Sequence, residues 1–244
     1  MRSLFLVLCG LTAILAAPGT KILGGDEAVL GQFPYQISIL YQNYLRCGGS
    51  IIDETTILTA AHCVLGYYPS LLSVKAGSVQ ISGIGQEHRV ASVRVHGDYA
   101  ESLLNDIAII KLATPLEFNE NIQPVSLPTS LIKGDSDVVI SGWGTTSYPG
   151  TVPDGLRFIH LKSMDWDTCN ALQTAEGWNV YSSQICTFTR YGEGVCSGDS
   201  GGPLVDTNGA QVGIVSWVTY CAVGVPDVYT SVHYYLDWIE ENRQ

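Results

Sequence analysis

The sequence predicts an all-β protein with a single α-helix at its carboxyl end, and three observations carry this prediction. Glycine accounts for 26 of the 244 residues. Val, Ile, Thr and Ser recur in short runs, which is typical of many short strands joined by turns. Near the end of the chain the spacing of apolar residues becomes helical. A hydrophobic content of 46% with only 14% charged residues indicates a folded chain rather than a disordered one.

Strand-like runs follow one another along the chain, separated by turn signals such as Pro153-Asp154-Gly155. Asn208-Gly209, between Pro203–Asp206 and Gln211–Val215, predicts a tight hairpin. The main predicted strands are Gln36–Leu40, Ser50–Thr59, Gln86–Val95, Ile107–Leu112, Asp137–Trp143, Ala210–Trp217 and Asp227–Ser231.

The last segment, Val232 to Asn242, is predicted to be a helix that packs one face on the body of the protein. A segment with two prolines, Asn119 to Gly134, separates two strand-rich halves and is the best candidate for a boundary. Neither half contains a helical pattern of any length. Two similar β units are therefore expected.

The first 17 residues have the pattern of a secretory signal peptide: a basic residue, an apolar stretch and small residues before a cleavage point. A membrane anchor is the alternative, but the apolar run is shorter than the roughly 20 residues that a bilayer requires. We therefore expect residues 1–17 to be removed and the protein to be secreted to the extracellular space, with no attachment to a membrane.

Secretion exposes the cysteines to an oxidising compartment, where disulfides form. The chain has seven, and Cys9 lies in the expected signal peptide. Six in an oxidising compartment predict three disulfides, with 15 pairings open. A zinc site is the alternative, but no CxxC or clustered Cys/His spacing supports it. The six are Cys47, Cys63, Cys169, Cys186, Cys196 and Cys221.

The chain is acidic, with a formal net charge of -11. Arg2 and Lys21 are the only charged residues among the first 21, so their removal makes the remaining chain still more acidic. Binding to nucleic acid requires basic patches, so nucleic acid is excluded as an expected partner. A large negative charge also opposes self-association, and we expect a monomer.

Three short segments contain residues able to perform chemistry. His62 ends the run Thr59-Ala60-Ala61-His62, Asp106 precedes an apolar strand, and Ser200 lies among glycines in Gly198–Leu204. Any one of these residues alone is more commonly structural. Together they supply a nucleophile, a base and an orienting acid, which is what the activation of an unreactive hydroxyl requires.

These segments, together with Ser141–Gly144 and Ser216–Trp217, resemble the hallmark segments of the trypsin/chymotrypsin family of serine proteases. They occur in the order of that family, and the resemblance runs from Ile22 to the end of the chain. It implies two antiparallel six-stranded β-barrels with a C-terminal helix, the first at about 22–125 and the second at about 126–244. Within the family, the chain looks most like arthropod digestive chymotrypsin-like enzymes.

The resemblance implies a secreted serine endopeptidase with His62, Asp106 and Ser200 as catalytic triad. Ser200 would attack the scissile carbonyl, His62 would carry the proton, and Asp106 would orient His62. The backbone N–H groups of Gly198 and Ser200 would form the oxyanion hole. The expected partners are protein or peptide substrates and protein protease inhibitors. No cofactor is implied.

The resemblance also implies a precursor. Residues 18–21 would be an activation propeptide, cleaved after Lys21 by a trypsin-like protease. The freed Ile22 amine would then pair with Asp199, whose burial alone is costly. The alternative is that Lys21 is only a linker residue. The disulfides implied are Cys47–Cys63, Cys169–Cys186 and Cys196–Cys221.

The predicted specificity pocket departs from the trypsin pattern at three positions. The resemblance puts Gly194 at the base, where trypsin-like members carry Asp, and Val218 and Asp227 on the walls. The missing base carboxylate favours Phe, Tyr or Leu as the residue before the cleaved bond (P1). Small apolar or basic P1 residues are the alternatives, because Val218 can shorten the pocket and Asp227 can meet a cation. Ser216, Trp217 and Val218 would pair with the substrate backbone.

Two other classes of protein share parts of this pattern. Gly198-Asp199-Ser200-Gly201-Gly202 also matches the nucleophile elbow of α/β-hydrolases, but the order His, Asp, Ser and the strand after Pro203 do not fit that fold. A protease-like binding protein without catalysis is the alternative of another class, although the triad is complete here. Family members that bind calcium do so through a loop of carboxylates in the first barrel. The corresponding stretch here, 77–89, has Glu87 as its only acidic residue, so no metal is expected.

Overall fold

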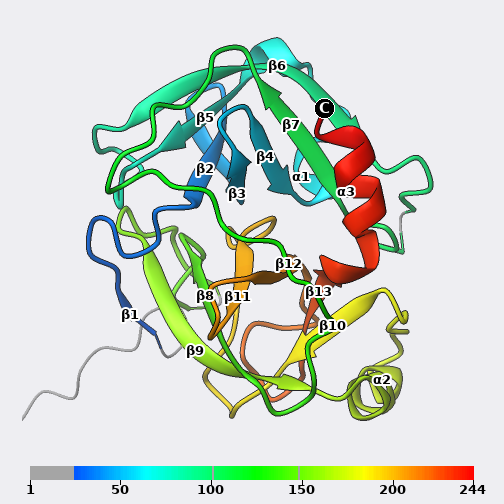
Figure 1. Ribbon diagram of the computed structural model, residues 1–244. Helices are drawn as coiled ribbons and strands as arrows, with labels where there is room; N and C mark the ends of the chain where they lie inside the picture. The colour runs from blue at the N-terminus through cyan, green and yellow to red at the C-terminus, as the bar shows by residue number, and fades with distance from the viewer. Residues whose placement is uncertain (1–24, 101, 148) are drawn as a thin grey trace, which may run out of the picture.

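The protein consists of two β-barrels, one above the other in Figure 1, with the carboxyl-terminal helix along one side. The structure is a computed structural model that describes residues 25–100, 102–147 and 149–244. Two antiparallel six-stranded barrels and a C-terminal helix are the fold class that the sequence and the family resemblance predicted, and the prediction is confirmed. The expected signal peptide, the propeptide and Ile22 lie outside the described residues.

The first barrel closes in the order β2-β3-β4-β7-β6-β5, and every pairing is antiparallel. Its interior is filled by β-branched and leucine side chains that are fully buried, among them Ile37, Ile57 and Ile109. Its strands are β2 (Gln36–Tyr41), β3 (Tyr44–Asp53), β4 (Thr56–Thr59), β5 (Leu72–Ala76), β6 (Gln86–Val95) and β7 (Ala108–Leu112).

The second barrel closes because β9 pairs with β8 as well as with β10, giving the order β9-β10-β13-β12-β11-β8. Its core is a separate cluster around Ile140, Leu204 and Tyr229. Its strands are β8 (Asp137–Gly142), β9 (Arg157–Met164), β10 (Gln184–Thr187), β11 (Pro203–Asp206), β12 (Gln211–Trp217) and β13 (Asp227–Ser231). The connection between the barrels, 113–136, includes the predicted boundary segment.

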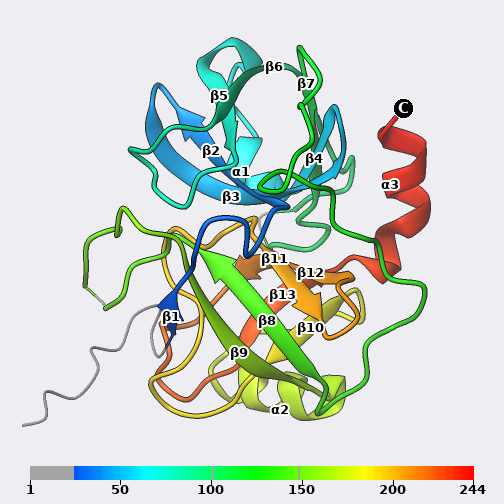
Figure 2. The ribbon, with the colours of Figure 1, turned by 60° about the vertical axis from the view of Figure 1, so that its left-hand side comes forward.

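Both ends of the described chain cross from one barrel to the other. Strand β1 (Asp26–Glu27) pairs with β9 of the second barrel, although it precedes the first. Helix α3 (Leu236–Asn242) follows the second barrel but packs on the first, since Val232, Tyr235 and Ile239 belong to the core of the first barrel. Figure 2 shows both crossings, with β1 beside the lower barrel and α3 beside the upper one. The barrels are therefore fastened together at both ends of the chain.

Two sequence predictions need correction. The second half does contain a helix, α2 (Trp166–Ala175). Only Cys169 and Gln173 of this helix are buried, so its apolar face is too narrow to produce a visible period. The run Ser50–Thr59 is two strands, β3 and β4, because Asp53 Oδ1 accepts a hydrogen bond from the backbone N–H of Thr55 and turns the chain.

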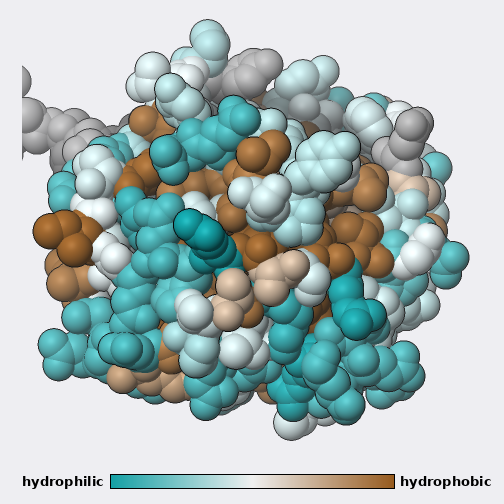
Figure 3. Space-filling model, turned by 90° about the horizontal axis from the view of Figure 1, so that it is seen from above, coloured by the Kyte–Doolittle hydropathy of each residue, from teal (hydrophilic) through white to brown (hydrophobic). Residues whose placement is uncertain are grey.

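The helices are otherwise short. The predicted C-terminal helix begins as a 3₁₀ turn, His233–Tyr235, and continues as α3. One further 3₁₀ turn covers Pro69–Leu71, and α1 covers Ala61–Val64. Within the described residues, no helix combines the length and the apolar character needed to cross a membrane. Seen from the side of the first barrel, the surface is a mixture of polar and apolar side chains (Figure 3).

The loop between β5 and β6 is organised around a lysine. Lys75 Nζ donates hydrogen bonds to the carbonyl oxygens of Ile81, at 2.9 Å, and Gly83, at 3.3 Å. Between them, Ser82 donates its N–H and its hydroxyl to the carboxylate of Asp154, which precedes β9. The ammonium group of Lys75 thus binds two carbonyls of this loop. The carboxylate of Asp154, from the other half of the chain, holds the residue between them, Ser82.

We predict that Lys75→Met lowers the free energy of unfolding by about 1–3 kcal/mol, because two carbonyls lose a charged donor. Urea denaturation of the variant and of the parent protein measures this. Lys133→Met is the matched control, because Lys133 is exposed on the linking segment. Equal losses in the two variants would contradict this role of Lys75.

Candidate active site

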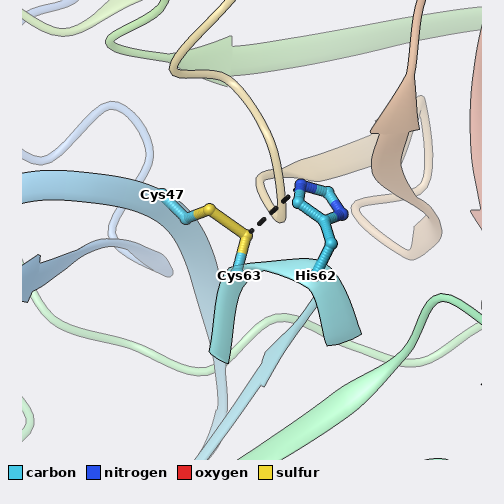
Figure 4. Close-up of side chains that lie close together, drawn as sticks. All are labelled: Cys47, His62 and Cys63. Atoms are coloured by element: carbon cyan, nitrogen blue, oxygen red, sulfur yellow. Dashed lines mark hydrogen bonds between the residues drawn. A yellow bond between two sulfur atoms is a disulfide. The ribbon is translucent and has the colours of Figure 1, made fainter. Parts of the chain in front are cut away.

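The turn that carries His62 is fixed by a disulfide. Helix α1 is a single turn, too short to be stable alone, and Cys63 within it is joined to Cys47 of β3. Figure 4 shows the imidazole beside this disulfide, with Nε2 at 3.8 Å from Sγ of Cys63. The disulfide therefore anchors the imidazole to the wall of the first barrel.

His62 and Asp106 are in direct contact. Nδ1 of His62 lies 2.8 Å from Oδ2 of Asp106, and the backbone N–H of His62 donates to Oδ1 at 3.0 Å. Asp106 is fully buried, whereas the imidazole is about one quarter exposed. A carboxylate acceptor requires a proton on Nδ1, so Nε2 of the neutral ring is left as the basic atom.

The second barrel completes the environment of Asp106. The hydroxyl of Ser216, on β12, donates to Oδ2 at 2.6 Å, and the hydroxyl of Thr230, on β13, donates to the backbone carbonyl at 2.8 Å. The carboxylate thus has three partners, the backbone N–H and Nδ1 of His62 and the hydroxyl of Ser216, which offset its loss of water on burial. The acid from the first barrel is thus held by two hydroxyls of the second.

A strained residue precedes the acid. Asn105 has φ of 58°, in the left-handed region, and its side-chain amide donates to the carbonyl of Asp98 at 2.8 Å. Its side-chain oxygen accepts from the hydroxyl of Tyr235 at 2.6 Å. Tyr235 lies just before α3, so the carboxyl end of the chain helps to set the backbone at Asp106. Sequence reasoning missed Thr230 and Tyr235, because nothing in their local sequence points to Asp106.

Ser200 lies at the junction of the barrels. Its carbonyl accepts from the N–H of Gly48, on β3, at 2.8 Å. Gly201 has φ of 76°, and a Cβ there would lie 3.1 Å from Sγ of Cys63 and overlap Thr59 and Gly48. Only glycine allows the chain after Ser200 to approach the first barrel so closely. The His62 ring and the residue next to Ser200 therefore contact the same sulfur.

Nε2 of His62 and the backbone next to Ser200 both lie close to the Cys47–Cys63 disulfide, but the Ser200 hydroxyl and Nε2 make no hydrogen bond with each other. Such bonds are commonly long before substrate binds and shorten in the substrate complex. The structure therefore brings the acid and the base together and holds the serine beside them.

The loop before Ser200 offers free backbone donors. Gly198 has φ of 105°, and within the described part of the chain neither its N–H nor that of Ser200 donates a hydrogen bond. Two unpaired N–H groups beside a hydroxyl are what an oxyanion hole requires.

Asp199 is fully buried behind this loop. Its carboxylate accepts from the N–H of Gly144 at 2.7 Å and from the N–H of Cys196 at 3.0 Å. A Cβ at Gly142 or Gly144 would overlap the carboxylate, so the two glycines make room for it. Burial raises the pKa of Asp199 to about 6, against these two hydrogen bonds, which lower it.

The predicted specificity pocket has a buried carboxyl, that of Asp227, beside Gly194 at its predicted base. Oδ2 of Asp227 accepts from the N–H of Val195 at 2.9 Å, and Oδ1 is buried with no hydrogen-bond partner among the described residues. A Cβ on Gly194, whose φ is 150°, would lie 2.5 Å from Oδ2 of Asp227. The carboxyl of Asp227 therefore fills the space that a side chain at position 194 would need. Burial and, to a smaller extent, the neighbouring Asp199 raise the pKa of Asp227 to about 8, against the Val195 hydrogen bond, which lowers it.

Two further predicted pocket residues, Trp217 and Val218, pack on the second barrel. Val218 packs against the cluster of the second barrel to which Val195 and Tyr229 belong. Trp217, at the end of β12, has its ring centroid 5.8 Å from that of Trp178, which is about half exposed. Sequence reasoning missed Trp178, since an aromatic residue in a loop carries no signal of its contacts.

The three disulfides join Cys47 to Cys63, Cys169 to Cys186 and Cys196 to Cys221. These are the pairs that the family resemblance implied. Cys47, His62 and Cys63 also bring three potential ligand atoms within 4.8 Å of one another. Both sulfurs are consumed by the disulfide, however, and zinc requires thiolates, so this cluster is not a metal site.

Comparison with known proteins agrees with this geometry. The family model described as Trypsin matches residues 22–239. Chymotrypsin-2 of Vespa crabro is 42% identical over 224 residues, covering 91% of this chain and all of that protein. Trypsin-1 of Astacus astacus is 39% identical, covering 91% of this chain and 99% of that protein. Trypsin II-P29 of Gallus gallus is 40% identical, covering 99% of this chain and 98% of that protein.

We predict that Tyr235→Phe lowers kcat for a peptide p-nitroanilide about two- to tenfold at unchanged KM, because one neutral hydrogen bond that sets Asn105 is lost. Steady-state kinetics and melting temperature are measured together. Tyr234→Phe is the control, since the Tyr234 ring packs on that of Tyr235 but is 57% exposed. The same kinetic change in both variants, or a change in KM alone, would rule out this positioning role.

Proposed function

The chain belongs to the trypsin family of serine proteases, and from this premise we propose that it is a secreted digestive chymotrypsin-like endopeptidase that is made as an inactive precursor. The observation that carries the proposal is the buried Asp106 in contact with Nδ1 of His62, which leaves Nε2 as the basic atom of the ring. Protein substrates follow from the family.

In the proposed reaction, Ser200 Oγ attacks the scissile carbonyl while Nε2 of His62 accepts its proton. His62 then protonates the leaving amine, and an acyl-enzyme remains on Ser200. Asp106 holds the Nδ1–H tautomer and stabilises the imidazolium that forms. The reverse sequence, with water in place of the amine, releases the acid product. The N–H groups of Gly198 and Ser200 stabilise the oxyanion, and each such donor contributes about 3 kcal/mol.

The proposed P1 preference is for apolar side chains. The support is that Asp227 lies beneath Gly194 with a pKa near 8, so its carboxyl is mostly neutral at pH 7. A Lys or Arg side chain in this pocket would meet no full negative charge, and a buried cation without a partner is strongly disfavoured. Val218 narrows the pocket, which shifts selectivity among apolar residues by about 1–3 kcal/mol without excluding most of them.

The proposed precursor is supported by the environment of Asp199. A carboxyl buried with only two backbone donors among the described residues is stabilised further by an incoming ammonium group. Cleavage after Lys21 supplies that group as the Ile22 amine. Asp199 is adjacent to Ser200 and Gly198, so the new ion pair orders the oxyanion loop. Residues 1–17 act as the secretion signal in this proposal, and residues 18–21 as the propeptide.

We predict that the activated enzyme cleaves matched p-nitroanilides ending in Phe or Leu with at least about tenfold higher kcat/KM than the one ending in Arg at pH 7. At pH 9, above its pKa of about 8, the Asp227 carboxyl is ionised, and Arg gains relative to Phe. Asp227→Asn removes this pH dependence. A clear preference for Arg at pH 7 that Asp227→Gly abolishes would contradict the apolar assignment.

We predict that a Lys21→Gln precursor, treated with a trypsin-like protease, keeps its residue 21–22 bond and is at least about a hundredfold less active, because the oxyanion loop stays unordered. Mass spectrometry of the N-terminus and hydrolysis of the Phe substrate measure the two effects. Lys133→Gln is the control that still activates. Full activity with an uncleaved N-terminus would disprove the precursor mechanism.

A further inference from the structure

Arg46 is held beside the catalytic base. It lies on β3, directly before Cys47, and its Nη2 donates to the backbone carbonyl of His62 at 3.2 Å. Its guanidinium carbon lies 5.2 Å from the centre of the Tyr67 ring, which in turn packs edge-on against Tyr41 at 4.8 Å. A hydrogen bond and a cation–π contact therefore fix a positive charge at this position.

This charge is available to a ligand. Arg46 is exposed, and within the described residues no carboxylate forms an ion pair with it. Only one N–H of the guanidinium donates to the carbonyl of His62, so further N–H donors remain. A planar guanidinium can bind a carboxylate through two parallel hydrogen bonds.

The imidazole separates the two ends of a bound peptide. Its Nδ1 faces Asp106 and, through it, Ser216, where the acyl side of the substrate is proposed to bind. Its Nε2 faces the Cys47–Cys63 disulfide. In the proposed reaction Nε2 protonates the leaving amine, which puts the residues after the scissile bond on the disulfide side of the imidazole, where Arg46 also lies.

We propose that Arg46 is a specificity-determining residue for the leaving-group side, and that it selects a carboxylate on the first two residues after the scissile bond. This inference rests on the proposed function. The carboxylate is an Asp or Glu side chain or a free chain end at that position. The acidic chain as a whole repels such substrates, so the preference comes from local contact and not from long-range attraction.

The test uses internally quenched peptides with one acyl side and Asp, Asn or Lys at the first or second position after the scissile bond. Amidated peptides isolate the side chain, and a matched pair with a free or amidated chain end tests the terminal carboxylate. We expect kcat/KM for Asp to exceed that for Asn by about three- to tenfold at low salt and to fall toward Asn in high salt.

Three variants separate the possible causes. R46Q should bring the Asp/Asn ratio close to one, and R46E should favour Lys. R94Q, which removes an exposed arginine from β6 of the same barrel, should leave the ratio unchanged. Hydrolysis of a p-nitroanilide, which has no residue after the scissile bond, should stay within about twofold in R46Q, because only the leaving-group side is affected.

Each contrary result has a distinct meaning. An Asp/Asn ratio that survives R46Q, or that R94Q also removes, overturns the role of Arg46. A loss of p-nitroanilide hydrolysis in R46Q equal to the loss with Asp peptides shows that Arg46 only holds His62, and also overturns it. An activated parent protein that hydrolyses no p-nitroanilide refutes the proposed function itself, and this inference with it.

Discussion

The contact on which the rest of the structure depends is the one between Asp106 and His62. The acid comes from the first barrel, yet Ser216 of the second barrel donates to its carboxylate and Thr230 donates to its backbone carbonyl. A buried carboxylate is stable only when its oxygens are hydrogen-bonded, so docking of the barrels stabilises the acid in its place. The geometry of the candidate triad is therefore linked to barrel docking, which the crossings of β1 and α3 reinforce.

Around this contact, small residues set the distances. Gly201 lets the serine loop approach Cys63, while Gly142 and Gly144 leave room for the carboxyl of Asp199. Gly194 likewise has no side chain, and the carboxyl of Asp227 occupies the space beside it in the proposed pocket. Arg46, in contrast, brings an exposed positive charge to the turn that carries His62.

Much of this could be predicted from the sequence. Apolar alternation and turn residues located most strands of the first barrel, and five short segments in order located the candidate triad. Helix α2 could not be seen, because only two of its residues are buried. The roles of Thr230, Tyr235 and Trp178 could not be seen either, because their contacts join segments far apart in the chain. Local patterns specify elements and motifs, whereas such contacts arise only from the packing of the barrels.

The central claim is that Ser200 is a nucleophile activated by His62 and Asp106, and fluorophosphonate labelling tests it most directly. A fluorophosphonate probe reacts with an activated serine and not with an ordinary hydroxyl. The account predicts one adduct on the protein cleaved after Lys21, mapped to Ser200 by mass spectrometry and largely lost in His62→Ala. An unlabelled Ser200 in the correctly cleaved, folded protein would contradict it and indicate a protease-like binding protein instead.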